Sequence, residues 1–161
     1  MPWKKVTKVA VAVGHAEGFT ALNALDNALL AAGIGNVNLV KVTSIIPPDV
    51  DLLAEMPKIR PGAIVPTAYA SQTGRVEGEI ISAAVGYGLP EDPARPGVIM
   101  EYSDKAPREV AERMIRRMIE AAFRTRGEPL GEVRVFGVEH RVERIGCAVA
   151  AVALLSEDDL L

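Results

Sequence analysis

The segment of residues 33–48 places the tightest limits on how this chain can fold. It begins with two glycines, continues through an apolar run that favours a β-strand, and ends at Pro47 and Pro48. Because proline has no N–H group to donate to a sheet, strand pairing must stop there. The bond between Thr43 and Ser44 therefore falls where a strand gives way to an extended turn, a place that can store backbone strain.

The Thr43–Ser44 pair has two interpretations. In the first, it is an ordinary turn before two prolines, which is what the residue types alone favour. In the second, the Ser44 hydroxyl attacks the carbonyl of Thr43 and converts the amide to an ester. Elimination of that ester and hydrolysis then leave a new chain that begins with a pyruvoyl group.

Composition indicates one domain with a substantial core, because the chain has 161 residues. Hydrophobic residues make up 49% and aromatic ones only 4%, so Val, Ala, Leu and Ile must fill the interior. The net charge of −3 argues against a nucleic-acid partner. The single cysteine, Cys147, excludes an intrachain disulfide and indicates a reducing compartment. No apolar run reaches the roughly 20 residues of a membrane span, so we expect a soluble, cytoplasmic protein without a membrane partner.

Two helices are predicted. The first covers residues 20–32, with Thr20 as its N-cap and Gly33 as its stop. The second covers residues 107–126, with Pro107 in its first turn and Gly127 as its stop. Helical spacing predicts that one stripe of the first helix faces the core: Leu22, Leu25, Leu29 and Ala32.

Strands are predicted at residues 6–13, 37–42, 62–70 and 98–102, and residues 80–85 fit either a helix or a strand. We expect the first strand to end at Gly14, and Pro66 to lie at a bulge or an edge. Residues 133–142 and 146–155 read as a closing hairpin, and residues 47–61 and 86–97 as long loops. Together these elements predict a single-domain α+β layered sandwich.

The chain resembles the pyruvoyl-dependent arginine decarboxylases, small trimeric enzymes that make agmatine from arginine. Besides residues 33–48, the resemblance includes LNALD at 22–26, PTAYA at 66–70 and IMEY at 99–102. It continues through VEH at 138–140 and GCA at 146–148, in the same order along nearly the whole chain. For the fold, the resemblance implies a four-layer αββα sandwich.

The resemblance also implies self-cleavage into residues 1–43 and 44–161, with a pyruvoyl group derived from Ser44. Decarboxylation leaves electrons on the α-carbon, and side chains accept them poorly, so an electrophilic carbonyl is needed. A Schiff base between the substrate amine and the pyruvoyl group would supply it, with no metal and no pyridoxal phosphate. His15, His140 and Cys147 lack the spacing of metal ligands.

Glu101 is implied as the proton donor to the α-carbon, a step that needs an acid with a pKa near the working pH. Its apolar neighbours Ile99 and Met100 predict partial desolvation and a raised pKa. Taken without the family, Glu101 is an ion-pair partner at a strand end. Asn38 matches the residue that assists self-cleavage, although on its own it reads as an amide paired with backbone.

Asp26 matches the position that binds the substrate guanidinium, to which a carboxylate can make two charge-assisted hydrogen bonds. Without the family it reads as a solvated helix position. In the family the pocket lies between subunits, so Asp26 and Ser44 can come from one chain and Glu101 from its neighbour. The positions that match the pocket walls are Leu22, Gly35, Val37 and Ile45.

The implied assembly is a homotrimer of cleaved protomers, and the sequence leaves open whether trimers pair further. Thr43 stands where the family more often has serine, and since it supplies only its carbonyl, this difference bears on the cleavage rate. Two alternatives remain: the same chemistry on another amino acid, or an uncleaved, non-catalytic trimer that binds a small cationic ligand. The sequence does not separate polyamine biosynthesis from acid defence.

Overall fold

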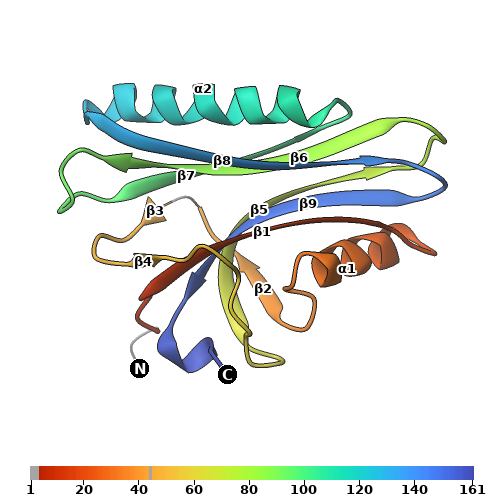
Figure 1. Cartoon of the computed structure of the whole chain (residues 1–161), viewed down its shortest axis with the longest axis horizontal. Helices are drawn as coiled ribbons and strands as arrows, with labels where there is room; N and C mark the ends of the chain where they lie inside the picture. Colours follow the sequence, from red (N-terminus) through yellow and green to blue (C-terminus); the bar gives the residue numbers. More distant parts are fainter. Residues whose placement is uncertain (1–3, 44) are drawn as a thin grey trace.

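The computed structural model of the chain describes residues 4–43 and 45–161. Within these ranges the chain forms two β-sheets and two α-helices (Figure 1). The strands of the first sheet are, in order, β2 (Asn38–Lys41), β5 (Ile64–Gly74), β9 (Gly146–Leu155), β1 (Lys8–Glu17) and β4 (Asp51–Leu52). Those of the second are β3 (Ile45–Ile46), β7 (Gly97–Asp104), β6 (Ile80–Pro90) and β8 (Leu130–Arg141). The helices are α1 (Ala21–Ala31), α2 (Arg108–Arg126) and the short 3-10 helix η1 (Glu157–Asp159).

The two sheets face each other, and each carries one helix on its other side (Figure 1). α1 packs against β1 and β9 of the five-stranded sheet, and α2 packs against β6, β7 and β8 of the four-stranded sheet. One buried cluster joins the facing surfaces: Val9, Ala68, Ala148 and Val152 from one sheet, with Ile81, Val85 and Ile99 from the other. The predicted α+β class is therefore confirmed.

β9 is the most deeply buried strand, because all ten of its residues are buried. It lies between β5 and β1, with α1 on one face and the four-stranded sheet on the other. Its sequence is mostly alanine and valine, so the layers on both sides can approach closely. This explains how a chain with few aromatic residues fills its core.

α1 begins and ends where the sequence predicts. The Thr20 hydroxyl accepts a hydrogen bond from the Asn23 N–H (3.1 Å), and Gly33 follows the helix with a φ of +84°. The predicted core stripe is confirmed for Ala32, which is buried, and Leu25 and Leu29 are partly buried against the same cluster. It is wrong for Leu22, which is 74% exposed, and the fully buried positions on this face are the small residues Ala24 and Ala28.

Close contact between β1 and α1 explains this correction. A Cβ atom on Gly14 would lie 2.3 Å from the carbonyl oxygen of Ala28, so the helix sits almost on the backbone of β1. Only small side chains fit in between, and the leucines are displaced to the flanks. Gly14 therefore does not end the strand as predicted, and β1 continues to Glu17.

The prediction for residues 86–97 differs from the structure for the same reason, because glycines there also make room for a helix. The predicted loop is confirmed only for residues 91–96, because β6 runs through Gly86 and Gly88 to Pro90 and β7 begins at Gly97. A Cβ atom on Gly88 would lie 2.6 Å from Cγ2 of Ile119, so the two glycines make room for α2. Residues 80–85, which fitted either a helix or a strand, are part of this strand.

The closing hairpin is also wrong, because β8 and β9 belong to different sheets. β8 pairs with β6, whereas β9 pairs with β5 and β1, and residues 142–145 cross from one sheet to the other. Periodicity shows that both segments are strands but not which neighbours they choose. The loop predicted at residues 47–61 contains the two-residue strand β4, which pairs with β1.

Pro66 lies where β5 has a neighbour on one side only. It pairs with Val40 of β2, and the ladder to β9 begins one residue later, at Thr67. This agrees with the expectation that a proline sits where no ladder donor is needed. In the described part of the chain, no helix is long and apolar enough to cross a bilayer.

We predict that Gly14→Ala destabilises the protein, because the new methyl group would meet backbone atoms of Ala28 and Ala32 that cannot move independently of α1. The expected loss is about 1–3 kcal/mol of unfolding free energy, measured by thermal or denaturant melting. Gly131→Ala is the matched control, since the nearest atoms there lie 3.2 Å from the Cβ position. Equal effects of the two changes would contradict the close packing of α1 on β1.

Candidate active site

The predicted cleavage site lies where the chain passes from one sheet to the other. β2 is an edge strand of the five-stranded sheet, and β3 is an edge strand of the four-stranded sheet. The Val42 N–H still donates to Thr67 (3.2 Å), and Ile45 already pairs with Val98 of β7. Ser44 itself lies outside the described residues, so its prediction stands as made. The bond before it is bracketed by edge strands of two different sheets.

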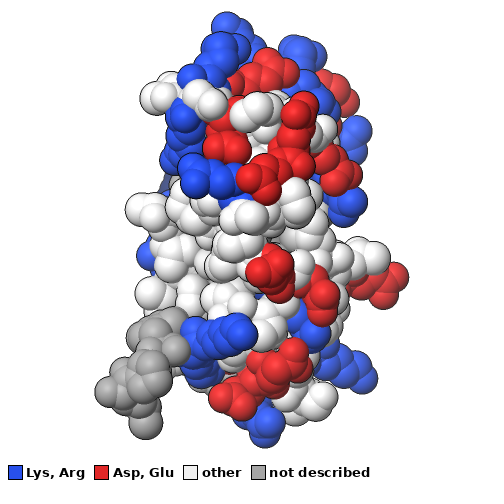
Figure 2. Space-filling model, turned by 90° about the vertical axis from the view of Figure 1, so that its left-hand side faces the viewer, with Lys and Arg blue, Asp and Glu red and all other residues white. Residues whose placement is uncertain are grey.

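The residues on either side of Ser44 lie at the surface, and the next residue along the chain, Ile46, is buried. Thr43 is exposed and Ile45 is 42% exposed, whereas Ile46 is buried in the cluster between the sheets. Figure 2 views the molecule from the side on which β3 and β4 lie in Figure 1, and the middle of this face is mostly uncharged.

Asn38 begins β2, and its side chain is engaged with the turn before β5. Its Nδ2 donates to the Gly62 carbonyl (3.2 Å), and its backbone N–H donates to Ala63 (2.8 Å). This is the backbone pairing that the residue type indicates by itself. Among the described residues, no hydrogen bond links the Asn38 side chain to Thr43.

Gly35 and Val37 lie in the connection between α1 and β2. A Cβ atom on Gly35 would lie 2.5 Å from the Leu30 side chain, so the turn folds back tightly on the end of α1. Val37 is half-buried and packs beside the cluster under α1. Both residues therefore lead directly into β2, which begins at Asn38.

Glu101 is the one half-buried acid near this crossing whose pKa is raised, among the described residues. It lies in β7 opposite Val85, and strand alternation places its side chain on the same face as Ile99, toward the other sheet. Burial raises the pKa of this carboxyl, and the positive charge of Lys41 only partly opposes the shift. The carboxyl can thus hold its proton closer to neutral pH than an exposed glutamate, as its flanking residues predict.

Lys41 is a residue that the sequence reasoning missed. It ends β2, and its ammonium lies 5.0 Å from the centroid of the Tyr69 ring, a cation–π contact. Its charge is the one in the described chain that acts on the pKa of Glu101. A signal was present, since Lys41 is the single charged residue in the apolar run before the predicted cleavage site.

Asp26 and Leu22 lie on the exposed side of α1, away from these groups. Asp26 is exposed, and α1 packs on the five-stranded sheet, whereas Glu101 belongs to the four-stranded sheet. In the described part of one chain, no hydrogen bond or ion pair joins Asp26 to Glu101 or Lys41. The structure therefore places Thr43, Ile45 and Glu101 on the elements that flank the crossing, Asn38 at the far end of β2 against Gly62, and Asp26 and Leu22 on the outward face of α1.

The fold is shared with a solved structure of pyruvoyl-dependent histidine decarboxylase at pH 8. The TM-score is 0.53 with 14% sequence identity, over 63% of this chain and 55% of that one. At this identity the similarity defines the class of fold and nothing about the substrate.

Sequence comparison is more specific. The family model for pyruvoyl-dependent arginine decarboxylase matches residues 8–159. The protein of that name from Methanocaldococcus jannaschii is 45% identical over 152 residues, covering 94% of this chain and 92% of that protein. The one from Pyrococcus abyssi is 45% identical over 156 residues, covering 96% and 98%. The chain belongs to the pyruvoyl-dependent arginine decarboxylase family.

We predict that Lys41→Met shifts the pH dependence of turnover to higher pH. Lys41 lowers the pKa of Glu101, so its removal raises that pKa further. If Glu101 donates a proton, activity falls as pH rises through its pKa, and this fall moves upward in the variant. The measurement is kcat against pH, and Lys41→Arg, which keeps the charge, should retain the original profile. A shift in the opposite direction would rule out Glu101 as the donor.

Proposed function

We propose that this protein is a self-processing decarboxylase that converts L-arginine to agmatine and CO₂ with a pyruvoyl group derived from Ser44. The observation that carries the proposal is the family match over residues 8–159, which includes the crossing between β2 and β3. The residues present suit such a group: Ser44 directly follows the exposed Thr43, and Glu101, with its raised pKa, lies in β7, which pairs with β3.

Processing would use the chain's own atoms. The Ser44 hydroxyl oxygen bonds to the Thr43 carbonyl carbon as the peptide C–N bond breaks, which gives an ester. Loss of the Ser44 α-proton and of the Thr43 carboxylate then leaves dehydroalanine, and hydrolysis with release of ammonia leaves the pyruvoyl chain end. Asn38 begins the strand that leads into this bond, and we assign it to support the carbonyl of Thr43 during the attack.

When formed, the pyruvoyl group would accept the electrons left behind as CO₂ departs. The chain's part is then to return a proton to the α-carbon. Glu101 suits this role because burial keeps its carboxyl protonated to higher pH than usual. The positive charge of Lys41 opposes this rise of the Glu101 pKa in part.

Substrate choice falls to Asp26. Its exposed carboxylate is available to a planar guanidinium, which it can bind through two parallel hydrogen bonds. Leu22, which is 74% exposed on the same helix, would cover the apolar part of the substrate. The remaining pocket walls are assigned to Gly35, Val37 and Ile45.

The site would be completed by assembly as a homotrimer of cleaved protomers. No hydrogen bond or ion pair joins Asp26 to Glu101 in the described part of one chain, and we assign the two groups of a site to different chains. Exposed apolar side chains near the crossing offer a contact surface, since Val40, Ile45 and Ile64 are 42%, 42% and 51% exposed.

For the protomer we propose the family's four-layer αββα sandwich as a single domain of residues 1–161, cut into 1–43 and 44–161. The placement of α1 and α2 on the outer faces of the two sheets supports it.

We predict that mature protein gives two fragments, residues 1–43 and 44–161, on a denaturing gel and by intact mass. Ser44→Ala should give one full-length chain and no CO₂ from arginine, because neither the attacking hydroxyl nor the pyruvoyl precursor is present. An uncut chain that still releases CO₂ would overturn the mechanism. An uncut chain that binds agmatine without turnover would support a non-catalytic trimer instead.

We predict that Asp26→Ala lowers kcat/KM for arginine by roughly 10- to 100-fold, the range expected for losing a charge-assisted pair. Cleavage into two fragments should remain complete, because Asp26 lies outside the processing segment. Glu120→Gln, which changes another exposed helical carboxylate, is the control and should leave kcat/KM unchanged. Unaltered arginine turnover in Asp26→Ala would indicate that another group, or another amino acid, defines specificity.

A further inference from the structure

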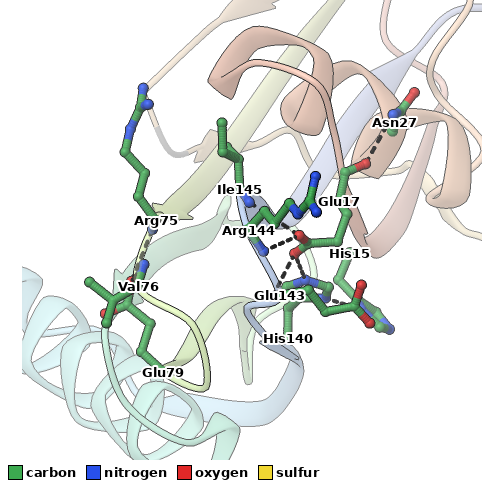
Figure 3. A network of polar contacts seen from close by, with 10 residues as sticks. All are labelled: His15, Glu17, Asn27, Arg75, Val76, Glu79, His140, Glu143, Arg144 and Ile145. Atoms are coloured by element: carbon green, nitrogen blue, oxygen red, sulfur yellow. Dashed lines mark hydrogen bonds and ion pairs between the residues drawn. The ribbon is translucent and has the colours of Figure 1, made fainter.

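A polar network at the end of β1 centres on the carboxylate of Glu17 (Figure 3). This carboxylate accepts backbone N–H bonds from Arg144 (2.7 Å), Ile145 (3.1 Å) and Glu143 (3.3 Å). It also contacts Nε2 of His140 at 2.5 Å. Glu17 thus fixes residues 143–145, where the chain crosses from β8 to β9, to the end of β1.

The second ring nitrogen of His140 is engaged as well. Its Nδ1 lies 2.8 Å from Nδ1 of His15, so one ring donates and the other accepts. The His140 side chain is only 10% exposed and that of Glu17 26%. Burial acts to raise the pKa of Glu17, but the hydrogen bonds from His140 and the backbone amides outweigh it, and the pKa is lowered. At neutral pH Glu17 is therefore ionised and accepts all these bonds.

The backbone of the same residue is tied to α1. The Glu17 carbonyl accepts a hydrogen bond from the Asn27 side chain (3.0 Å), one residue along the helix from Asp26 (Figure 3). The next residue, Gly18, donates its N–H to Ile145 (3.0 Å). A Cβ atom on Gly18 would lie 2.1 Å from the backbone nitrogen of Ala24, so this turn is pressed against the helix.

We propose that Glu17 is a positioning residue for substrate binding: its carboxylate holds the β8–β9 crossing, and its carbonyl, through Asn27, sets where α1 presents Asp26. The inference rests on the proposed function, in which Asp26 binds the guanidinium. In this inference Glu17 and Asn27 hold Asp26 in place, and neither of them contacts the substrate. Such placement matters because small displacements of binding groups reduce affinity strongly.

Glu79 provides a matched comparison on the other side of the same crossing. Its carboxylate accepts backbone N–H bonds from Arg75 (3.1 Å) and Val76 (3.3 Å). The Glu79 carbonyl accepts a hydrogen bond from the N–H of Val142, the residue that begins the crossing (2.9 Å). The neighbouring Gly78 N–H donates to the Val142 carbonyl (2.8 Å). Among the described residues, Glu79 makes no hydrogen bond to α1. Removing the charge of Glu79 therefore reports the effect of weakening this crossing on stability, without disturbing the hydrogen bond that connects the crossing to α1 and Asp26.

The experiment compares Glu17→Gln, Asn27→Ala and Glu79→Gln in the cleaved enzyme, with agmatine and n-pentylamine as inhibitors. Agmatine carries the guanidinium and n-pentylamine does not. We expect the first two variants to weaken agmatine inhibition on the order of tenfold while leaving inhibition by n-pentylamine within about twofold. Their KM for arginine should rise more than kcat falls. Glu79→Gln should leave the ratio of the two inhibition constants unchanged.

Three results would overturn the inference: equal weakening of both inhibitors, the same change in Glu79→Gln, or no change in agmatine inhibition. If Glu17→Gln fails to fold, Asn27→Ala carries the test, because it leaves the carboxylate network intact. A wild-type enzyme without arginine turnover would refute the proposed function and this inference with it. Normal wild-type turnover with an unchanged inhibitor ratio in Asn27→Ala would refute this inference alone.

Discussion

The rest of the structure depends on the burial of β9 on both faces. All ten of its residues pair with β1 on one side and eight of them pair with β5 on the other, while α1 and the four-stranded sheet cover its two surfaces. Only alanine, valine and similar small residues allow the layers to lie so close together. In the same way, the glycines of β1 and β6 leave room for α1 and α2 to pack directly against the strand backbones. In this arrangement β2 is an edge of the sheet that contains β9 and β3 is an edge of the four-stranded sheet, so the segment that joins them crosses between the two sheets.

That crossing would meet two requirements of the site proposed above. A bond that is to rearrange needs fixed neighbours, and the hydrogen bond of Val42 on one side and the pairing of Ile45 on the other supply them. A substrate needs access, which the exposure of Thr43 and Ile45 provides. Glu101 lies in β7, next to the edge strand β3, and is only partly buried. Burial raises its pKa, and the positive charge of Lys41 opposes this rise in part.

Local signals in the sequence predicted both helices, their caps, most strands and the α+β class. What failed were choices that depend on distant partners. Gly14, Gly86 and Gly88 look like strand ends or loops, yet they make room for helices that pack across them. Leu22 has the spacing of a core residue, but the narrow gap over Gly14 admits only alanines. The resemblance assigned roles to Glu101 and Asp26, which stay predictions, whereas Lys41 and Glu17 were recognised from the charges and amides that the fold brings beside them.

The order of strands in the five-stranded sheet bears on the fate of a chain cut before Ser44. The smaller piece would contribute β1, inserted between β9 and β4, and β2, added outside β5. The two pieces would thus alternate within one sheet, and neither could leave without unzipping ten residue pairs along β9. Such a protein would fold before it is cut, while the two pieces are still one continuous chain. After denaturation its recovery would become a bimolecular reaction, slowed by dilution in a way that the uncut precursor is not.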